Sequence, residues 1–193
     1  LETQIRRGAP ADVFLSAAEE PVQALIAAGL AAPEDVRIFA TNRLVLVRGP
    51  HASAGLQTWE DLLRSDVRRI AVGNPEHVPA GQYSRTVLEN LGLWEQLQNK
   101  LVFGEDVRQV LAYVESGAAD AALVYSTDAQ MAQRVRALAP APPGTHPPIR
   151  YSAAVVRTSR APREARAFVD FLLSEDSRAI LTAHGFGAPE DEE

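Results

Sequence analysis

Short apolar runs alternate along the chain with longer stretches in which apolar residues recur every three or four positions. The short runs predict strands at residues 12–16, 43–47, 69–73, 101–103 and 121–125. The longer stretches predict helices at residues 21–29, 79–90 and 106–115, with a short helix after Thr58. Strands separated by helices are typical of an α/β fold built on mainly parallel sheets with helices on both faces.

The last third of the chain opens with a proline-rich segment. Residues 138–150, LAPAPPGTHPPIR, predict an extended connection rather than a core element. A strand at residues 151–158 follows, and then helices at 162–173 and 175–184. Ser174 is a suitable N-cap for the last helix, and Gly185 a suitable end.

The chain begins inside a helical pattern, with Leu1 and Ile5 on one face and Gly8 as the stop. It shows no initiator Met, helix cap or signal peptide at this point. We therefore expect an N-terminal portion, with any targeting sequence, to precede Leu1.

Composition narrows the classes of function. The 193 residues suffice for one or two domains, and the net charge of −6 argues against a broad nucleic-acid-binding face. Cysteine is absent, which removes disulfides, cysteine-ligated zinc and thiol catalysis. The four histidines lack metal-ligand spacing, and neither Ser16 nor Ser126 lies in a nucleophile elbow. His77, beside Glu76, suits a polar turn better than acid–base chemistry.

Three features share one predicted geometry. Strand 71–73 leads to a helix whose first turn holds Pro79, Ala80 and Gly81, and strand 101–103 leads to one beginning at Asp106 and Val107. Strand 121–124 delivers Tyr125 at its carboxyl end. These ends meet at one edge of a parallel sheet, where unpaired helix N–H groups attract anions. Any α/β protein has such helix starts, so the pattern alone leaves a purely structural role equally open.

Four segments of the chain are more distinctive than its general α/β pattern: RRGAPADVFLSA, VGNPEHVPAGQY, GEDVRQVLAYVESGAADAALVYSTDA and the closing HGFG. Together they resemble the periplasmic molybdate-binding proteins of bacterial ABC transporters, over essentially the whole chain. Asn74 stands where that family usually has Asp.

The resemblance implies a site that holds a tetrahedral oxyanion through neutral donors. The backbone N–H groups of Ala80 and Val107 and the hydroxyl of Tyr125 would bind molybdate. Pro79, Gly81 and Asp106 would support them. Molybdenum would enter only as the oxyanion, with no direct protein ligand to the metal and no cofactor. Two further serine ligands of the family would precede Leu1.

The resemblance also implies a type II periplasmic-binding-protein fold, in which two α/β lobes joined by a two-crossing hinge close over the ligand. Residues 1–41 with 154–193 would form the first lobe, which lacks its N-terminal part here. Residues 42–153 would form the second. The crossings would lie near residues 41–42 and 151–153.

The implied function is capture of molybdate, and of tungstate, for delivery to a membrane ABC permease and its ATPase. The protein would be a monomeric binding protein and not an enzyme, would bind no nucleic acid, and would work in the periplasm or lipid-anchored outside the cytoplasmic membrane. The effector domain of a transcription regulator and a sulfate-type oxyanion-binding protein are the alternatives. An enzyme acting on oxyanion esters would need a nucleophile–base pair or metal set that the sequence does not show.

Overall fold

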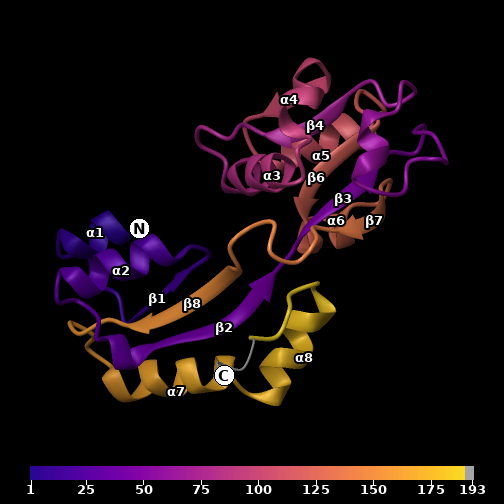
Figure 1. Cartoon of the computed structure of the whole chain (residues 1–193). Helices are drawn as coiled ribbons and strands as arrows, with labels where there is room; N and C mark the ends of the chain where they lie inside the picture. The colour runs from indigo at the N-terminus through magenta and orange to yellow at the C-terminus, as the bar shows by residue number, and fades with distance from the viewer. Residues whose placement is uncertain (190–193) are drawn as a thin grey trace. The chain divides into compact units, whose positions relative to one another are not determined.

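The computed structural model of the chain describes residues 1–189 and divides into two compact units (Figure 1). The first unit comprises Leu1–Asn42 and Pro148–Glu193, and the second comprises Arg43–Pro147. The chain therefore passes between units twice, after Asn42 and before Pro148. The second of these points lies a few residues before the crossing expected from the sequence.

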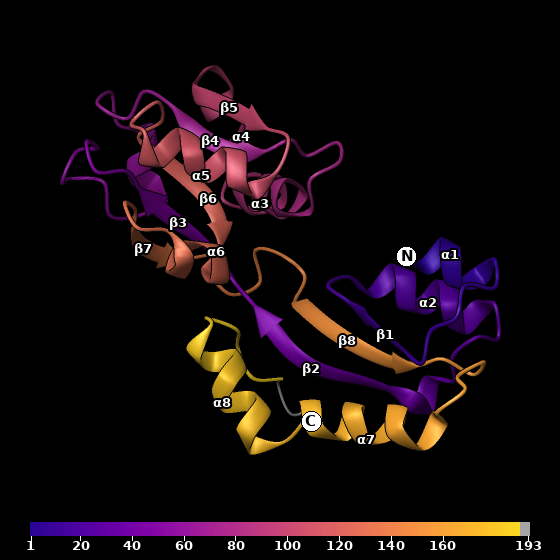
Figure 2. The same ribbon diagram turned by 180° about the vertical axis from the view of Figure 1, so that it is seen from behind.

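The first unit is built on a three-stranded sheet in the order β1-β8-β2. Its elements are α1 (Glu2–Arg6), β1 (Val13–Ser16), α2 (Glu19–Ala27), β2 (Val36–Asn42), β8 (Ile149–Val155), α7 (Pro162–Leu172) and α8 (Glu175–Ala183). Helices α2 and α7 lie on opposite faces of the sheet in both views (Figures 1 and 2). Phe14 and Leu25 belong to the core on the α2 face, and Phe39 and Val169 to the core on the α7 face.

The expectation of a mainly parallel sheet is wrong for this unit. Both β1 and β2 pair antiparallel with β8, which lies between them. Strands β1 and β2 do run parallel to each other, as a strand–helix–strand unit requires, but they are not neighbours. The inserted strand comes from more than a hundred residues further along the chain, and local patterning carries no sign of it. The sequence analysis also did not predict β2.

The second unit carries a five-stranded sheet in the order β5-β4-β6-β3-β7. Its strands are β3 (Leu44–Arg48), β4 (Ile70–Gly73), β5 (Leu101–Gly104), β6 (Ala121–Tyr125) and β7 (Arg136–Pro140), and its helices are α3 (Pro79–Asn90), α4 (Trp94–Leu97), α5 (Val107–Glu115) and α6 (Ser126–Met131). Strand β4 pairs parallel with β5 and β6, whereas β3 pairs antiparallel with β6 and β7. Because β7 includes residues 138–140, the proline-rich connection starts later than the sequence predicts.

Apolar residues cover both faces of this sheet. In β3, Leu44 and Leu46 belong to a core shared with Val87 and Leu88 of α3. The alternate residues Val45 and Val47 belong to a second core with Val110 and Val114 of α5. The continuous apolar runs in the sequence therefore mark strands buried on both sides, which confirms the predicted α/β class.

No helix within residues 1–189 combines the length and the apolar character needed to cross a membrane.

Candidate oxyanion-binding site

The three predicted ligand positions lie at the carboxyl ends of three neighbouring strands in the second unit. Strand β4 leads to α3 with Ala80, β5 leads to α5 with Val107, and β6 ends at Tyr125. These strands are adjacent and parallel, in the order β5-β4-β6, so their carboxyl ends share one edge of the sheet. Ligands of open α/β sheets bind at such an edge.

The start of α3 is set by a proline and two small residues. Pro79 is the first helical residue, where its missing N–H and fixed φ suit a helix start. The N–H groups of Gly81 and Gln82 donate to the carbonyl of Val78, at 2.9 and 3.1 Å. The N–H of Ala80 has no acceptor among the described residues. It is therefore an available donor at a positive helix end.

Gly81 lets this helix start approach β4. A side chain at position 81 would overlap the carbonyl oxygen of Gly73, and its Cβ would lie 2.9 Å from the carbonyl carbon of Asn74. Asn74 holds the preceding turn, since its Oδ1 accepts the N–H of Glu76 at 3.0 Å. An Asp would offer the same acceptor, so the exchange of Asp for Asn keeps the turn intact.

The start of α5 repeats the arrangement with a polar cap. Asp106 is the N-cap residue, and its Oδ1 accepts the N–H of Gln109 at 2.8 Å. The carbonyl of Asp106 accepts the N–H of Val110 at 3.2 Å. The N–H of Val107 has no acceptor among the described residues, and its side chain is half-buried. Asp106 therefore organises the helix end and leaves the first amide available.

Tyr125 is half-buried at the end of β6 and is packed by aromatic neighbours. The ring of Tyr83, from α3, meets the Tyr125 ring edge-on with 6.4 Å between centroids. The ring of His146 meets Tyr83 edge-on at 5.5 Å. These contacts fix the tyrosine ring beside the start of α3, a role of Tyr83 and His146 that the sequence analysis did not identify.

Two contacts tie the loop after β4 to the loop after β5. The N–H of Asn74 donates to the carbonyl of Gly104 at 2.8 Å. Nε2 of His77 lies 2.9 Å from Oε2 of Glu105, and both side chains are largely exposed. The sequence analysis favoured a plain turn role for His77 and missed this partner, which is 28 positions away.

Pairing of His77 with Glu105 should make a small, measurable contribution to stability. In a double-mutant cycle with His77→Ala and Glu105→Ala, we expect a coupling of about 0.5 kcal/mol, the low end of the range for a hydrogen bond, because both side chains are largely exposed. Urea unfolding measures it. Strictly additive single-mutant effects would show that the contact does not hold the two loops together.

The donors at this edge are all uncharged. Two backbone N–H groups and one phenol can donate hydrogen bonds to an oxyanion. The N–H groups have no lone pair for a metal ion, and a single phenol oxygen does not make a metal site. The described residues hold no group of three or more His, Asp or Glu side chains arranged for a metal ion. The arrangement therefore suits an anion whose own oxygens accept hydrogen bonds.

Comparisons with known proteins identify the family of the chain. Residues 1–187 match the family model described as bacterial extracellular solute-binding protein. The molybdate-binding protein of Haemophilus influenzae is 35% identical over 194 residues, covering 97% of this chain and 75% of that protein. A Bacillus subtilis protein, provisionally named as the ABC transporter substrate-binding lipoprotein YvgL, is 38% identical over 188 residues. That alignment covers 97% of this chain and 72% of the Bacillus protein.

A solved structure from Clostridium difficile, provisionally titled as the substrate-binding domain of a molybdenum ABC transporter, has the same fold. It superposes with a TM-score of 0.91 at 36% identity, over 98% of this chain and 82% of that one. The family match covers nearly the whole chain and two relatives exceed one-third identity. The chain belongs to the family of bacterial extracellular solute-binding proteins.

Proposed function

We propose that this solute-binding protein captures molybdate, and also tungstate, through the edge of the β5-β4-β6 sheet. The observation that carries the proposal is the pair of available amides, at Ala80 and Val107, that begin two helices beside Tyr125. The molybdate-binding relative from Haemophilus influenzae and the molybdenum-transporter domain from Clostridium difficile support the choice of ligand. Membership of a solute-binding family agrees with the expectation of a binding protein rather than an enzyme.

Neutral donors suit a dianion that must leave water. Each amide or hydroxyl bond to an anion contributes about 1.5–3 kcal/mol net, so several together offset the cost of desolvation. The amides of Ala80 and Val107 are fixed by the helix starts that contain them, and binding orders them little further. A flexible arginine would attract the same anion but would lose side-chain entropy on binding.

The backbone N–H groups also select by protonation state. They cannot accept a hydrogen bond, so an O–H of protonated phosphate that faces them would be buried without an acceptor, which costs the desolvation of that group. Sulfate and molybdate carry no proton at neutral pH and pass this filter. Rejection of sulfate would then depend on size, and tungstate, close to molybdate in size, would be accepted.

Titration calorimetry with four oxyanions tests the proposal. We expect molybdate and tungstate to bind the full-length protein tightly, including any segment that precedes Leu1, with sulfate bound weakly and phosphate least. Thermal unfolding should shift upward with the same order of ligands, because each stabilises the folded state in proportion to its binding. Equal or tighter binding of sulfate would favour a sulfate-type protein, and no response to molybdate would overturn the proposal.

Replacing Tyr125 by Phe tests the hydroxyl alone. We expect the affinity for molybdate to fall by about 1–3 kcal/mol, the cost of an unmatched hydrogen bond to an anion, with little loss of stability. Tyr113→Phe on α5 is the matched control, since it removes a phenol hydroxyl elsewhere in the same unit. Unchanged affinity together with a lower melting temperature would make Tyr125 a packing residue.

We infer further that the loaded protein delivers its anion to a membrane ABC permease. The family is extracellular, and the Bacillus subtilis relative carries the name of a transporter lipoprotein. Both support a place of action in the periplasm or on the outer face of the cytoplasmic membrane.

A further inference from the structure

A basic hollow lies in the second unit, away from the candidate oxyanion site. It has a volume of about 380 Å³ and is lined by Arg48, Arg134 and Arg136, together with Gln133 and the turn at Gly49. None of the described residues that line it is acidic. A concentration of positive charge is notable in a chain whose net charge is −6.

Two of these arginines face each other across a strand pair. Arg48 at the end of β3 and Arg136 at the start of β7 are direct antiparallel partners. Directly opposed residues of such a pair project from the same face, and like charges there are destabilising. Arg48 is held in place, because its Nη1 donates to the carbonyl of Ser53 at 3.1 Å. The sheet thus carries an unfavourable charge pair that a bound anion would relieve.

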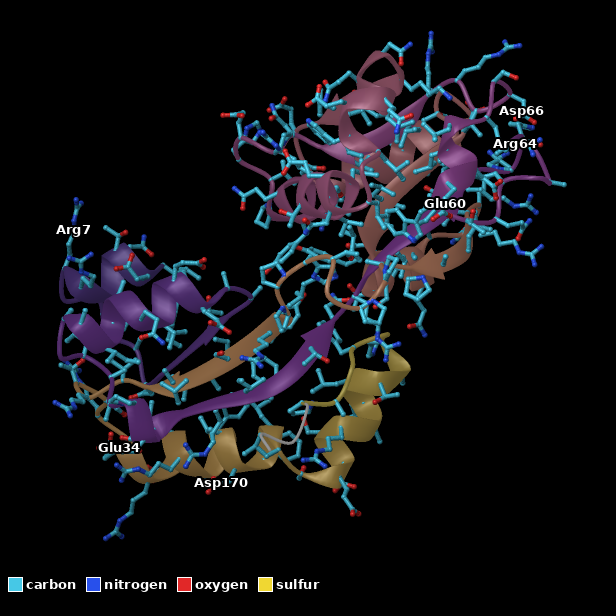
Figure 3. The ribbon with its side chains drawn as sticks, viewed as in Figure 1. Arg7, Glu34, Glu60, Arg64, Asp66 and Asp170 are labelled. Atoms are coloured by element: carbon cyan, nitrogen blue, oxygen red, sulfur yellow. The ribbon has the colours of Figure 1, made fainter. Side chains whose placement is uncertain are left out.

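Two acids close to this hollow have other hydrogen-bond partners. Glu115 accepts the backbone N–H groups of Gln133 and Arg134 through Oε1, at 3.0 and 3.3 Å. Asp66 forms a two-point pair with Arg64, with both N–O distances at 3.0 Å, and the two side chains lie together in Figure 3. Hydrogen bonding by the Arg64 guanidinium holds the pKa of Asp66 down at about 2. Within residues 1–189, none of the three hollow-lining arginines forms an ion pair.

The hollow and the candidate oxyanion site lie at opposite ends of one strand. In the β3–β6 pair, Leu44 opposes Tyr125, whereas Arg48 opposes Ala121. The length of this five-residue strand separates them by roughly 14 Å. The arginines therefore belong to a separate site and not to the rim of the first one.

We propose that this hollow is a second anion site, for a small polyanion that carries phosphoryl or carboxyl groups. Guanidinium groups bind both groups through paired N–H donors. The hollow is open to solvent, so its ligand stays partly hydrated and is held by charge, in contrast to the neutral donors proposed for molybdate. Its volume suits a small molecule rather than a protein segment.

Pyrophosphate and citrate are suitable probes of the two chemistries. Titration calorimetry at low ionic strength, on protein loaded with one equivalent of molybdate, keeps the probes out of the first site and leaves the hollow free of excess molybdate. We expect at least one probe to bind and its affinity to fall steeply with added salt. Tighter binding of pyrophosphate would indicate a site for phosphoryl groups, and tighter binding of citrate a site for carboxyl groups.

Arg136→Gln is the variant that separates this site from simple surface charge. It should lower the affinity for the bound probe at least tenfold, leave the affinity for molybdate unchanged, and raise the melting temperature in anion-free buffer by relieving the opposed pair. Arg134→Gln should also lower the affinity for the probe, but it should not raise the melting temperature, because Arg134 is not part of the opposed pair. Arg163→Gln is the matched control. It removes one exposed positive charge from α7 of the other unit and leaves the hollow unchanged.

Two outcomes would overturn the proposal. One is the absence of binding by either probe at millimolar concentration and low ionic strength. The other is an equal loss of probe affinity in Arg163→Gln and Arg136→Gln, which would mean that net charge alone attracts the anion.

Discussion

Replacing Gly81 by Ala should weaken molybdate binding by about tenfold or more and lower the free energy of unfolding by about 1–3 kcal/mol. A Cβ at this position would collide with the carbonyl oxygen of Gly73, at the end of β4. The atoms that this Cβ would meet, in Gly73 and Asn74, all belong to the backbone and cannot rotate aside, so the start of α3 must move away from the strand. That movement displaces the N–H of Ala80, one residue earlier, from the edge where the anion would bind.

Chemical denaturation gives the stability of the Gly81 variant, and calorimetry well below its melting temperature gives its affinity. Gly55→Ala is the control, because a Cβ there meets only the end of the flexible Arg64 side chain, 2.9 Å away. We expect that control to match the parent protein in both measurements. If the Gly81 variant were destabilised but bound molybdate with the affinity of the parent protein, the start of α3 would not take part in binding.

Much of the second unit could be predicted from the sequence because its elements are local. Helix α3 runs from Pro79 to Asn90 as predicted, since a proline start and an apolar stripe are both readable over a few residues. Strand β6, with its apolar run, has the predicted bounds as well. The first unit was less predictable, because β8 inserts between β1 and β2 from a distant part of the chain.

The same distinction applies to the candidate site. Ala80 and Val107 lie in the first turns of helices that follow β4 and β5, and Tyr125 ends β6, so local patterns could identify all three as candidates. Adjacent parallel strands then bring them to one edge. Contacts between loops, such as that of His77 with Glu105, depend on tertiary placement and leave no local signal. The opposition of Arg48 and Arg136 is equally invisible, since it depends on the register of β7, a strand the sequence did not predict.

The two proposed anion sites differ in a way that experiment can separate. The arginine hollow would hold its ligand by charge in contact with water, so salt should weaken it strongly. The candidate oxyanion site, at the carboxyl ends of β5, β4 and β6, would hold molybdate by oriented dipoles. Its affinity should depend on individual N–H groups more than on ionic strength. Deleting one such N–H is therefore the most direct test of the first site.

An ester in place of the Ala80 amide, made by incorporating lactate at that position, removes the N–H without adding any atoms. We expect the Kd for molybdate to rise about 10- to 150-fold, which corresponds to the loss of one hydrogen bond to an anion worth about 1.5–3 kcal/mol. Stability should change little, because this N–H has no acceptor among the described residues. Ala80→Pro, the genetic alternative, adds a ring beside Pro79 and restrains that residue as well.

The matched control is the same ester at Gln82, in the same turn of α3. Its N–H donates to the carbonyl of Val78 at 3.1 Å, so its loss should lower stability and leave molybdate affinity close to that of the parent protein. We therefore expect the ester at position 80 to weaken binding and spare stability, and the ester at position 82 to lower stability and spare binding. If the ester at position 80 destabilised the fold while molybdate bound as before, the amide would serve the helix, and the oxyanion would have to bind elsewhere.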